Sequence, residues 1–200
     1  KTYNEDGNWL VSEWEDGADS RGRNTMTYDE DGNWIVWEYD EGADGIIEER
    51  WEAFYDEDGN QILYRKDYGN DGVWDYIAER SYDEDGNMVL YKNKYTDAYD
   101  GLGDGWDYLS VQTHDEDGNT LTSTIDEDAD GDFDSSWTNS YDEDGNLTST
   151  VEDADNDGID DNAYTRTYNA AGQLLVYEED EGMDGSIDKR ISRAYDIDGN

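Results

Sequence analysis

Apolar and polar residues alternate along many short stretches of this chain. Over residues 47–55, the odd positions include Trp51 and Tyr55, whereas the even positions are mostly charged. A period of two places the odd residues on one face of an extended strand. Residues 34–39 and 120–125 form a second kind of stretch, short and rich in aromatic or β-branched residues, which also predicts strands. We therefore expect strands along the whole chain and no helix.

The hexapeptide Tyr-Asp-Glu-Asp-Gly-Asn recurs along the chain, and most successive copies are 27 residues apart. Self-similarity at such a period is typical of an array of supersecondary units that bury their apolar faces only against neighbouring units. We expect residues 1–200 to form a single array of about seven units and to be a segment of a longer array. The units start near Tyr3, Tyr28, Tyr55, Tyr82, His114, Tyr141 and Tyr168, and a further copy of the hexapeptide starts at Tyr195.

Each unit reads as strand, acidic turn, strand, acidic turn. The hexapeptide forms the first turn, and its Tyr is the last residue of the strand before it. Short connections of this kind predict antiparallel hairpins. The expected fold class is all-β: a repeat array of two-stranded β-hairpin units with a 27-residue period, forming a twisted or spiralling antiparallel sheet.

The composition changes this picture in one respect, which is charge. Leu, Ile, Val and Phe make up only 28 of 200 residues and the formal net charge is −43, a combination typical of disorder. However, 17 Tyr and 8 Trp recur at fixed phases of the repeat and can bury large surfaces. Mutual repulsion among 56 carboxylates predicts that the folded form needs bound cations.

The available metal ligands are hard oxygens, because the chain has no cysteine. Such ligands favour Ca²⁺, which we expect as the cofactor. Because calcium is abundant outside cells, we expect an extracellular or cell-surface location. The strong acidity argues against nucleic acid as a partner, and no run of residues is apolar enough to predict membrane insertion.

The first turn predicts an ordinary β-turn, with a metal loop as the alternative. Its alternating acids and Gly resemble the opening of an EF-hand loop. In the copy Asn169-Ala170-Ala171-Gly172-Gln173, however, both acids are replaced while the Gly and the following strand remain. This replacement favours turn geometry over metal binding as the reason for the motif.

The second turn predicts calcium binding more strongly. Counting the hexapeptide Tyr as position 0, five copies have acids at positions 12, 16 and 20 and Gly at position 17, whereas the first and the fourth copy depart from this spacing. Crowded carboxylates in a flexible turn repel one another unless a cation lies among them. The alternative is a solvated acidic loop that protects the edge of the sheet. The candidate ligands are Asp40, Asp44 and Glu48; Asp67, Asp71 and Asp75; Asp104 and Asp107; Asp126, Asp128, Asp130 and Asp134; Asp153, Asp155, Asp157 and Asp161; and Asp180, Asp184 and Asp188.

The Tyr-Asp-x-x-Gly-Asn motif followed by a short strand resembles the YD repeats of the Rhs family and of the related teneurin and toxin-complex shells. This resemblance implies β-hairpins that build a long spiralling sheet, often a hollow shell around a toxin. The repeat here is longer than the usual one. Its Asp-x-Asp-x-Asp-Gly turns are similar to the calcium loops of thrombospondin type 3 repeats and are not part of the YD pattern.

No residue pattern predicts an active site, so we do not expect an enzyme. His114 replaces the motif Tyr, which indicates a packing substitution. The leading hypothesis is an extracellular, calcium-stabilised structural repeat protein: a stalk, an adhesin segment or a filament subunit. The alternatives are part of a Rhs-type shell around a toxin, and a carbohydrate-binding surface of aromatic rows that include Trp34 and Trp37. The expected partners are further repeats of the same chain, or other copies assembled end to end or side by side, with glycans as a further candidate.

Overall fold

The computed structural model describes residues 1–15, 21–96 and 105–196. Within these ranges every regular element is a β-strand, as the sequence predicts. No described helix is long and apolar enough to cross a membrane. The all-β prediction is therefore confirmed.

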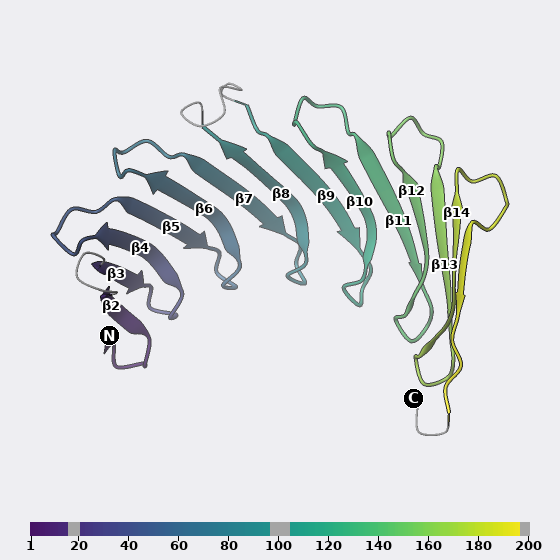
Figure 1. Cartoon of the computed structure of the whole chain (residues 1–200), viewed down its shortest axis with the longest axis horizontal. Helices are drawn as coiled ribbons and strands as arrows, with labels where there is room; N and C mark the ends of the chain where they lie inside the picture. Colours follow the sequence, from purple (N-terminus) through teal and green to yellow (C-terminus); the bar gives the residue numbers. More distant parts are fainter. Residues whose placement is uncertain (16–20, 97–104, 197–200) are drawn as a thin grey trace. The chain divides into compact units, whose positions relative to one another are not determined.

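The chain divides into two compact units, Lys1–Asp107 and Tyr108–Asn200. In each unit the strands follow one another in chain order, and each pairs antiparallel with the next (Figure 1). The first unit contains β1 (Thr2–Tyr3), β2 (Trp9–Glu15), β3 (Arg21–Tyr28), β4 (Trp34–Glu41), β5 (Glu49–Tyr55), β6 (Gln61–Tyr68), β7 (Tyr76–Tyr82) and β8 (Met88–Tyr95). The second contains β9 (Tyr108–His114), β10 (Thr120–Asp126), β11 (Ser135–Tyr141), β12 (Leu147–Asp153), β13 (Asn162–Tyr168), β14 (Leu174–Glu181) and β15 (Lys189–Ser192).

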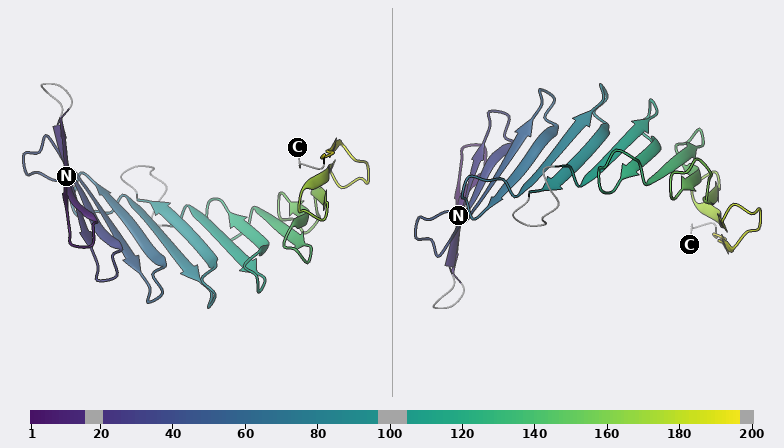
Figure 2. Two further views of the ribbon diagram at one scale, coloured as in Figure 1. Left: turned by 90° about the horizontal axis from the view of Figure 1, so that it is seen from below. Right: turned by 90° about the horizontal axis from the view of Figure 1, so that it is seen from above.

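The strands of each unit form a single layer (Figure 2). Among the described strands, β1 pairs only with β2 and β15 only with β14, so the sheet of each unit remains open at that edge. A single layer leaves few residues without solvent contact. The only fully apolar residues that are buried in the described ranges are Ala53 and Ala78.

The hexapeptide Tyr ends its strand, as predicted, and the three residues after the following Asp form a tight loop. In the copy at Tyr28, the N–H of Asp29 donates to the carbonyl of Asn33, and the N–H of Gly32 donates to the carbonyl of Asp29. Gly32 has a φ of 87°, a left-handed conformation that Gly adopts without steric penalty. This is a three-residue hairpin loop with Gly at its last position.

The strands after the second turn begin later than the alternation predicts. The period-two pattern starts at Ile47, whereas β5 starts at Glu49. The carboxylate of Glu48 accepts the backbone N–H of Glu41, so a side chain caps the backbone where the pattern predicts the ladder. The regular ladder therefore starts two residues later.

Side chains on the two faces of the first unit connect neighbouring strands. On one face, Trp37 and Trp51 lie with ring centroids 4.2 Å apart, and Tyr64 contacts Trp51 edge to face. On the other face, Glu52 accepts hydrogen bonds from both Arg50 and Arg65. Cross-strand contacts of this kind stabilise a sheet that lacks a second layer.

The hydroxyl of the hexapeptide Tyr joins consecutive hairpins. The Tyr82 hydroxyl donates to the carbonyl of Gln61 at 3.2 Å, and the Tyr168 hydroxyl donates to the carbonyl of Leu147 at 2.9 Å. Tyr28, Tyr141 and Tyr195 make the equivalent hydrogen bond to Trp9, Thr120 and Leu174. In these five places the motif Tyr therefore holds its hairpin against the one before it.

Candidate metal-binding turns

Five second turns are described completely, and they share two left-handed positions. Position 15 has a positive φ although it is never Gly, as at Ala43 (51°) and Asn156 (51°). Position 17 is always Gly, with φ of 94° at Gly45 and 86° at Gly158. Two left-handed residues this close together reverse the chain sharply, and they aim several backbone N–H groups into the turn.

The Asp at position 12 accepts these N–H groups. In the turn after β10, Asp126 Oδ1 accepts the N–H of Asp130 at 3.2 Å, and Asp126 Oδ2 accepts the N–H of Gly131 at 3.0 Å. Asp126 is only 1% exposed. Asp40, Asp67 and Asp153 are also buried and make the same pair of hydrogen bonds. We call these residues the anchor aspartates.

The acids at positions 16 and 20 also bind backbone. Asp130 Oδ1 accepts the N–H of Asp132 at 2.9 Å, and Asp134 Oδ2 accepts the N–H of Glu127 at 2.6 Å. The same two hydrogen bonds recur in the other four turns. The spacing from which the sequence predicts calcium therefore also has a structural cause, because each of the three acids caps the turn.

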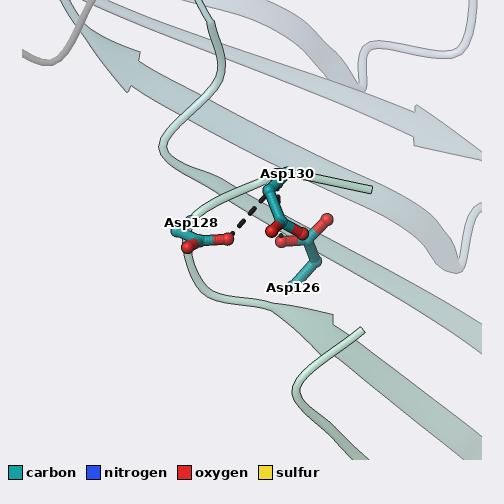
Figure 3. Close-up of side chains that lie close together, drawn as sticks. All are labelled: Asp126, Asp128 and Asp130. Atoms are coloured by element: carbon teal, nitrogen blue, oxygen red, sulfur yellow. Dashed lines mark hydrogen bonds between the residues drawn. The ribbon is translucent and has the colours of Figure 1, made fainter. Parts of the chain in front are cut away.

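Position 14 divides the five turns into two types. It is Gly42, Gly69 or Gly182 in what we call the Gly-type turns, and Asp128 or Asp155 in the Asp-type turns. The Asp-type turns are the two places in the described chain where three carboxylates offer ligand atoms within 4.8 Å of one another. One group is Asp126, Asp128 and Asp130 (Figure 3), and the other is Asp153, Asp155 and Asp161.

The geometry of the Asp-type groups fits a hard cation. In Figure 3 the side chains of Asp126, Asp128 and Asp130 converge, and Asp128 Oδ1 also accepts the N–H of Asp130 at 3.3 Å. Each anchor oxygen accepts one hydrogen bond and keeps a second lone pair. Carboxylate oxygens in a flexible turn are the ligands that Ca²⁺ prefers.

The remaining predicted ligands are not gathered in this way. In the Gly-type turns, the acids at positions 12, 16 and 20 accept backbone N–H groups. No three carboxylates in these described turns offer ligand atoms within 4.8 Å of one another. Asp107 accepts the backbone N–H of Tyr95, whereas Asp104 lies outside the described residues. Metal binding stays a prediction for Asp40, Asp44, Glu48, Asp67, Asp71, Asp75, Asp107, Asp134, Asp157, Asp180, Asp184 and Asp188.

The first turns use their leading Asp as a cap. Asp142 Oδ1 accepts the N–H groups of Asp144 at 3.1 Å and of Asn146 at 2.8 Å. Hydrogen bonds from the Asn146 side chain and then from its backbone N–H lower the pKa of Asp142, against a smaller opposing effect of desolvation. In the copy without acids, Asn169 Oδ1 accepts the N–H groups of Ala171 and Gln173 in the same way. The acids at the third and fourth positions of the motif are therefore not needed for this turn.

The sequence pattern leaves two structural roles unassigned. The Tyr hydroxyl that reaches the preceding hairpin is one, because the motif itself does not reveal its partner 21 residues earlier. The other is position 14, where the difference between Gly and Asp separates the two types of turn. Its signal was present as the extra Asp of Asp126-x-Asp128-x-Asp130 and Asp153-x-Asp155-x-Asp157.

These features define a tandem β-hairpin repeat protein. No family model matches the chain, and no curated protein matches its sequence. Its fold does match solved structures. The crystal structure of TcdB2-TccC3-Cdc42 aligns with 98% of the chain, with a TM-score of 0.56 and 16% identity. That of TcdB2-TccC3 without the hypervariable C-terminal region aligns with 100% of the chain, with a TM-score of 0.56 and 15% identity.

The chain spans 12% of the length of each of these two matched chains. At 15–16% identity the likeness shows the fold alone. The resemblance to YD repeats that the hexapeptide predicts is thereby confirmed at the level of the fold.

Proposed function

We propose that this chain is a non-catalytic structural segment of a larger Rhs-type YD-repeat protein, in which its hairpins form part of a shell wall. The observation that carries the proposal is the hydrogen bond from the motif Tyr to the hairpin before it, which five motif Tyr residues make across both units. Such a bond makes every hairpin depend on its neighbour, as a continuous wall requires. The match of the whole chain to a small part of TcdB2-TccC3 supports the same reading.

Electron microscopy of the full-length protein tests this proposal. A wall segment predicts a hollow particle in which the hairpins of this chain follow the shell. An extended rod or a fibre would instead favour the stalk or filament hypothesis. A catalytic domain elsewhere in the full-length protein would not bear on the role of this segment.

We further propose that Ca²⁺ binds the two Asp-type turns and stabilises them. Three carboxylates within 4.8 Å of one another repel strongly, and a divalent ion converts this repulsion into attraction. Two ions would also offset part of the formal net charge of −43. Sites of this type in extracellular modules bind with Kd values of roughly 10⁻⁴ to 10⁻³ M, which suits an extracellular or cell-surface setting.

Calorimetric titration of the 200-residue chain with CaCl₂ tests the calcium sites. The test variant is Asp128→Asn with Asp155→Asn, which removes one carboxylate from each group. The matched control is Glu116→Gln with Glu143→Gln, which removes the same formal charge from exposed positions in first turns of the same unit. We expect the test variant to lose two bound ions and the control to keep them.

Equal ion binding by the test variant and the control would contradict the assignment. Thermal melts with and without chelator add a second measurement, because an ion that binds only the folded chain raises its stability. An unchanged melt in excess chelator at low ionic strength would reject stabilisation by calcium even if ions bind.

A further inference from the structure

Both kinds of turn contain an Asp-Gly dipeptide, and such dipeptides are chemically labile. The Gly nitrogen can attack the carboxyl carbon of the preceding Asp, because Gly has no side chain to hinder the approach. We propose that the Asp-Gly bonds of the first turns are sites of spontaneous isoaspartate formation, and that hydrogen bonds in the second turns protect theirs. The proposal is independent of calcium.

The reaction needs only water. In the first step the protonated form of the carboxyl reacts: the Gly N–Cγ bond forms, the Cγ–OH bond breaks, and the Gly proton and the carboxyl hydroxyl leave as water, which gives a succinimide. In the second step water opens the ring. Attack at one carbonyl restores Asp, and attack at the other moves the main chain onto the side-chain carbonyl and leaves a free α-carboxylate. No oxidant or cofactor takes part.

In the first turns the reacting groups are weakly restrained. The side chain of Asp31 is exposed, and its carboxylate has no hydrogen-bond partner among the described residues. The N–H of Gly32 donates to the carbonyl of Asp29 at 3.3 Å and also interacts with the Asp29 carboxylate, which is only half-buried. The equivalent bonds to the carbonyl in the other first turns with Asp-Gly measure 3.0–3.2 Å. The Asp-Gly pairs of this class begin at Asp6, Asp31, Asp58, Asp85, Asp117 and Asp144.

In the second turns both reacting groups are held. Asp71 Oδ1 accepts the N–H of Val73 at 2.9 Å, which fixes the carboxylate. The N–H of Gly72 donates to Oδ2 of the buried anchor Asp67 at 2.9 Å, which fixes the nucleophile. Attack therefore requires the turn to open and to lose two hydrogen bonds, one of them to a buried charged group.

The turn after β14 is a natural intermediate between the two classes. Gly185 donates to Asp180 Oδ2 at 3.2 Å, but the other oxygen of Asp180 is buried and has no hydrogen-bond partner. Its anchor is thus weaker than Asp153, both of whose oxygens accept N–H groups. We expect Asp184 to react more slowly than the first-turn residues and faster than Asp44, Asp71, Asp130 and Asp157.

Isoaspartate would disrupt a first turn because it inserts a methylene group into the main chain of a three-residue loop. The Asn33 N–H and the Asp29 carboxylate would no longer meet at their present 2.8 Å. The strand register that this loop sets would also be weakened. Each affected hairpin would therefore loosen from its neighbours without any change in formal charge.

The test is incubation of the folded 200-residue chain in chelator at 37 °C, followed by proteolysis and mass spectrometry. Succinimide is quantified by the loss of one water, and isoaspartate by enzymatic methylation with an isoaspartyl methyltransferase. We expect first-turn sites to react about fivefold or more faster than Asp44, Asp71, Asp130 and Asp157, the ratio that corresponds to about one net hydrogen bond. The copy at Ala171-Gly172 has no Asp at the reacting position and serves as the blank.

Two controls tie the result to the structure. In concentrated urea the two classes should react at similar rates, since the turns are absent. Replacing the anchor by Asp67→Asn should raise the rate at Asp71 and leave Asp44 unchanged. If that variant does not fold by circular dichroism, the rate of Asp184 relative to Asp157 in the unmodified chain makes the same comparison. Equal rates for both classes in the folded chain, or faster reaction in the second turns, would overturn the proposal.

Discussion

The Gly-type and Asp-type turns share the same anchor and the same left-handed residues, yet they use position 14 differently. In a Gly-type turn, Gly69 has a φ of 95° and donates its N–H to the carbonyl of Glu48, which extends the ladder between β5 and β6. In an Asp-type turn, the strand ends one residue earlier, at Asp126, and Asp128 joins a group of carboxylates. One residue therefore decides whether the turn extends the ladder or gathers three acids.

This difference indicates that the acidic spacing and the metal site are separate properties. All five turns retain the capping acids at positions 12, 16 and 20, because those acids satisfy backbone N–H groups. Only an additional Asp at position 14 creates a group with three converging carboxylates in the described chain. Each of the following predictions tests one part of this separation.

The largest effect should follow from removing an anchor aspartate of either type. Asp67→Ala and Asp126→Ala each leave two backbone N–H groups without their acceptor. We expect each variant to lose about 2–4 kcal/mol of unfolding free energy in calcium-free urea denaturation. Asp132→Ala, an exposed residue in the same turn as Asp126, should change it by less than about 0.5 kcal/mol. A large loss for Asp126→Ala alone would show that the two types do not share an anchor.

The next effect concerns position 14 itself. In calcium-free buffer, Gly69→Asp should destabilise the chain by about 1–3 kcal/mol, because only Gly adopts a φ of 95° without strain. Gly69→Ala is the control, since it introduces the same strain without a carboxylate. The reverse change, Asp128→Gly, should leave calcium-free stability nearly unaltered and abolish one calcium site. A stable Gly69→Asp variant would contradict the role assigned to this conformation.

The sequence predicted the strands and the first turns well, because each depends on local chemistry. Alternation sets the face of β5, and the Gly at the end of each hexapeptide loop needs its positive φ whatever lies around it. The sequence could not separate capping from metal binding at Asp126. Both roles require an oxygen that faces the inside of the turn, so both produce the same spacing.

Contacts between hairpins were beyond the sequence for a different reason. The partner of the Tyr168 hydroxyl is a backbone carbonyl, at Leu147, and a carbonyl leaves no trace in the residue type. Within a hairpin, the Glu52 contact with Arg65 depends on the register of β5 and β6. Register follows from the turn between the strands and not from either strand alone.

A smaller effect should follow from removing the hydroxyl of the motif Tyr, which lies directly before the first turn. Hairpins beside Gly-type turns and hairpins beside Asp-type turns both have this Tyr. Tyr82→Phe and Tyr168→Phe each lose one hydrogen bond to the preceding hairpin. We expect each to lower the unfolding free energy by about 0.5–1.5 kcal/mol. Tyr3→Phe is the control, because Tyr3 is 58% exposed. An effect in only one of the two variants would mean that the contact of the motif Tyr also differs between hairpins beside Gly-type turns and hairpins beside Asp-type turns.

The smallest effect is the pH dependence of the first turns, which should be the same beside both types of second turn. The Asn146 side chain and backbone lower the pKa of Asp142, and Asn119 does the same for Asp115. A carboxyl with a lowered folded pKa contributes stability that is present above its unfolded pKa, about 3.9, and is lost as the pH falls through the folded pKa. Carbon-detected NMR titration should therefore give both carboxyls a midpoint below that of a hexapeptide of the same sequence.

Asp142→Asn reproduces the natural Asn169 copy and should remove this contribution while keeping the turn, because Asn169 makes the same two backbone contacts. A folded midpoint at or above that of the peptide would mean that these hydrogen bonds do not favour the charged carboxylate.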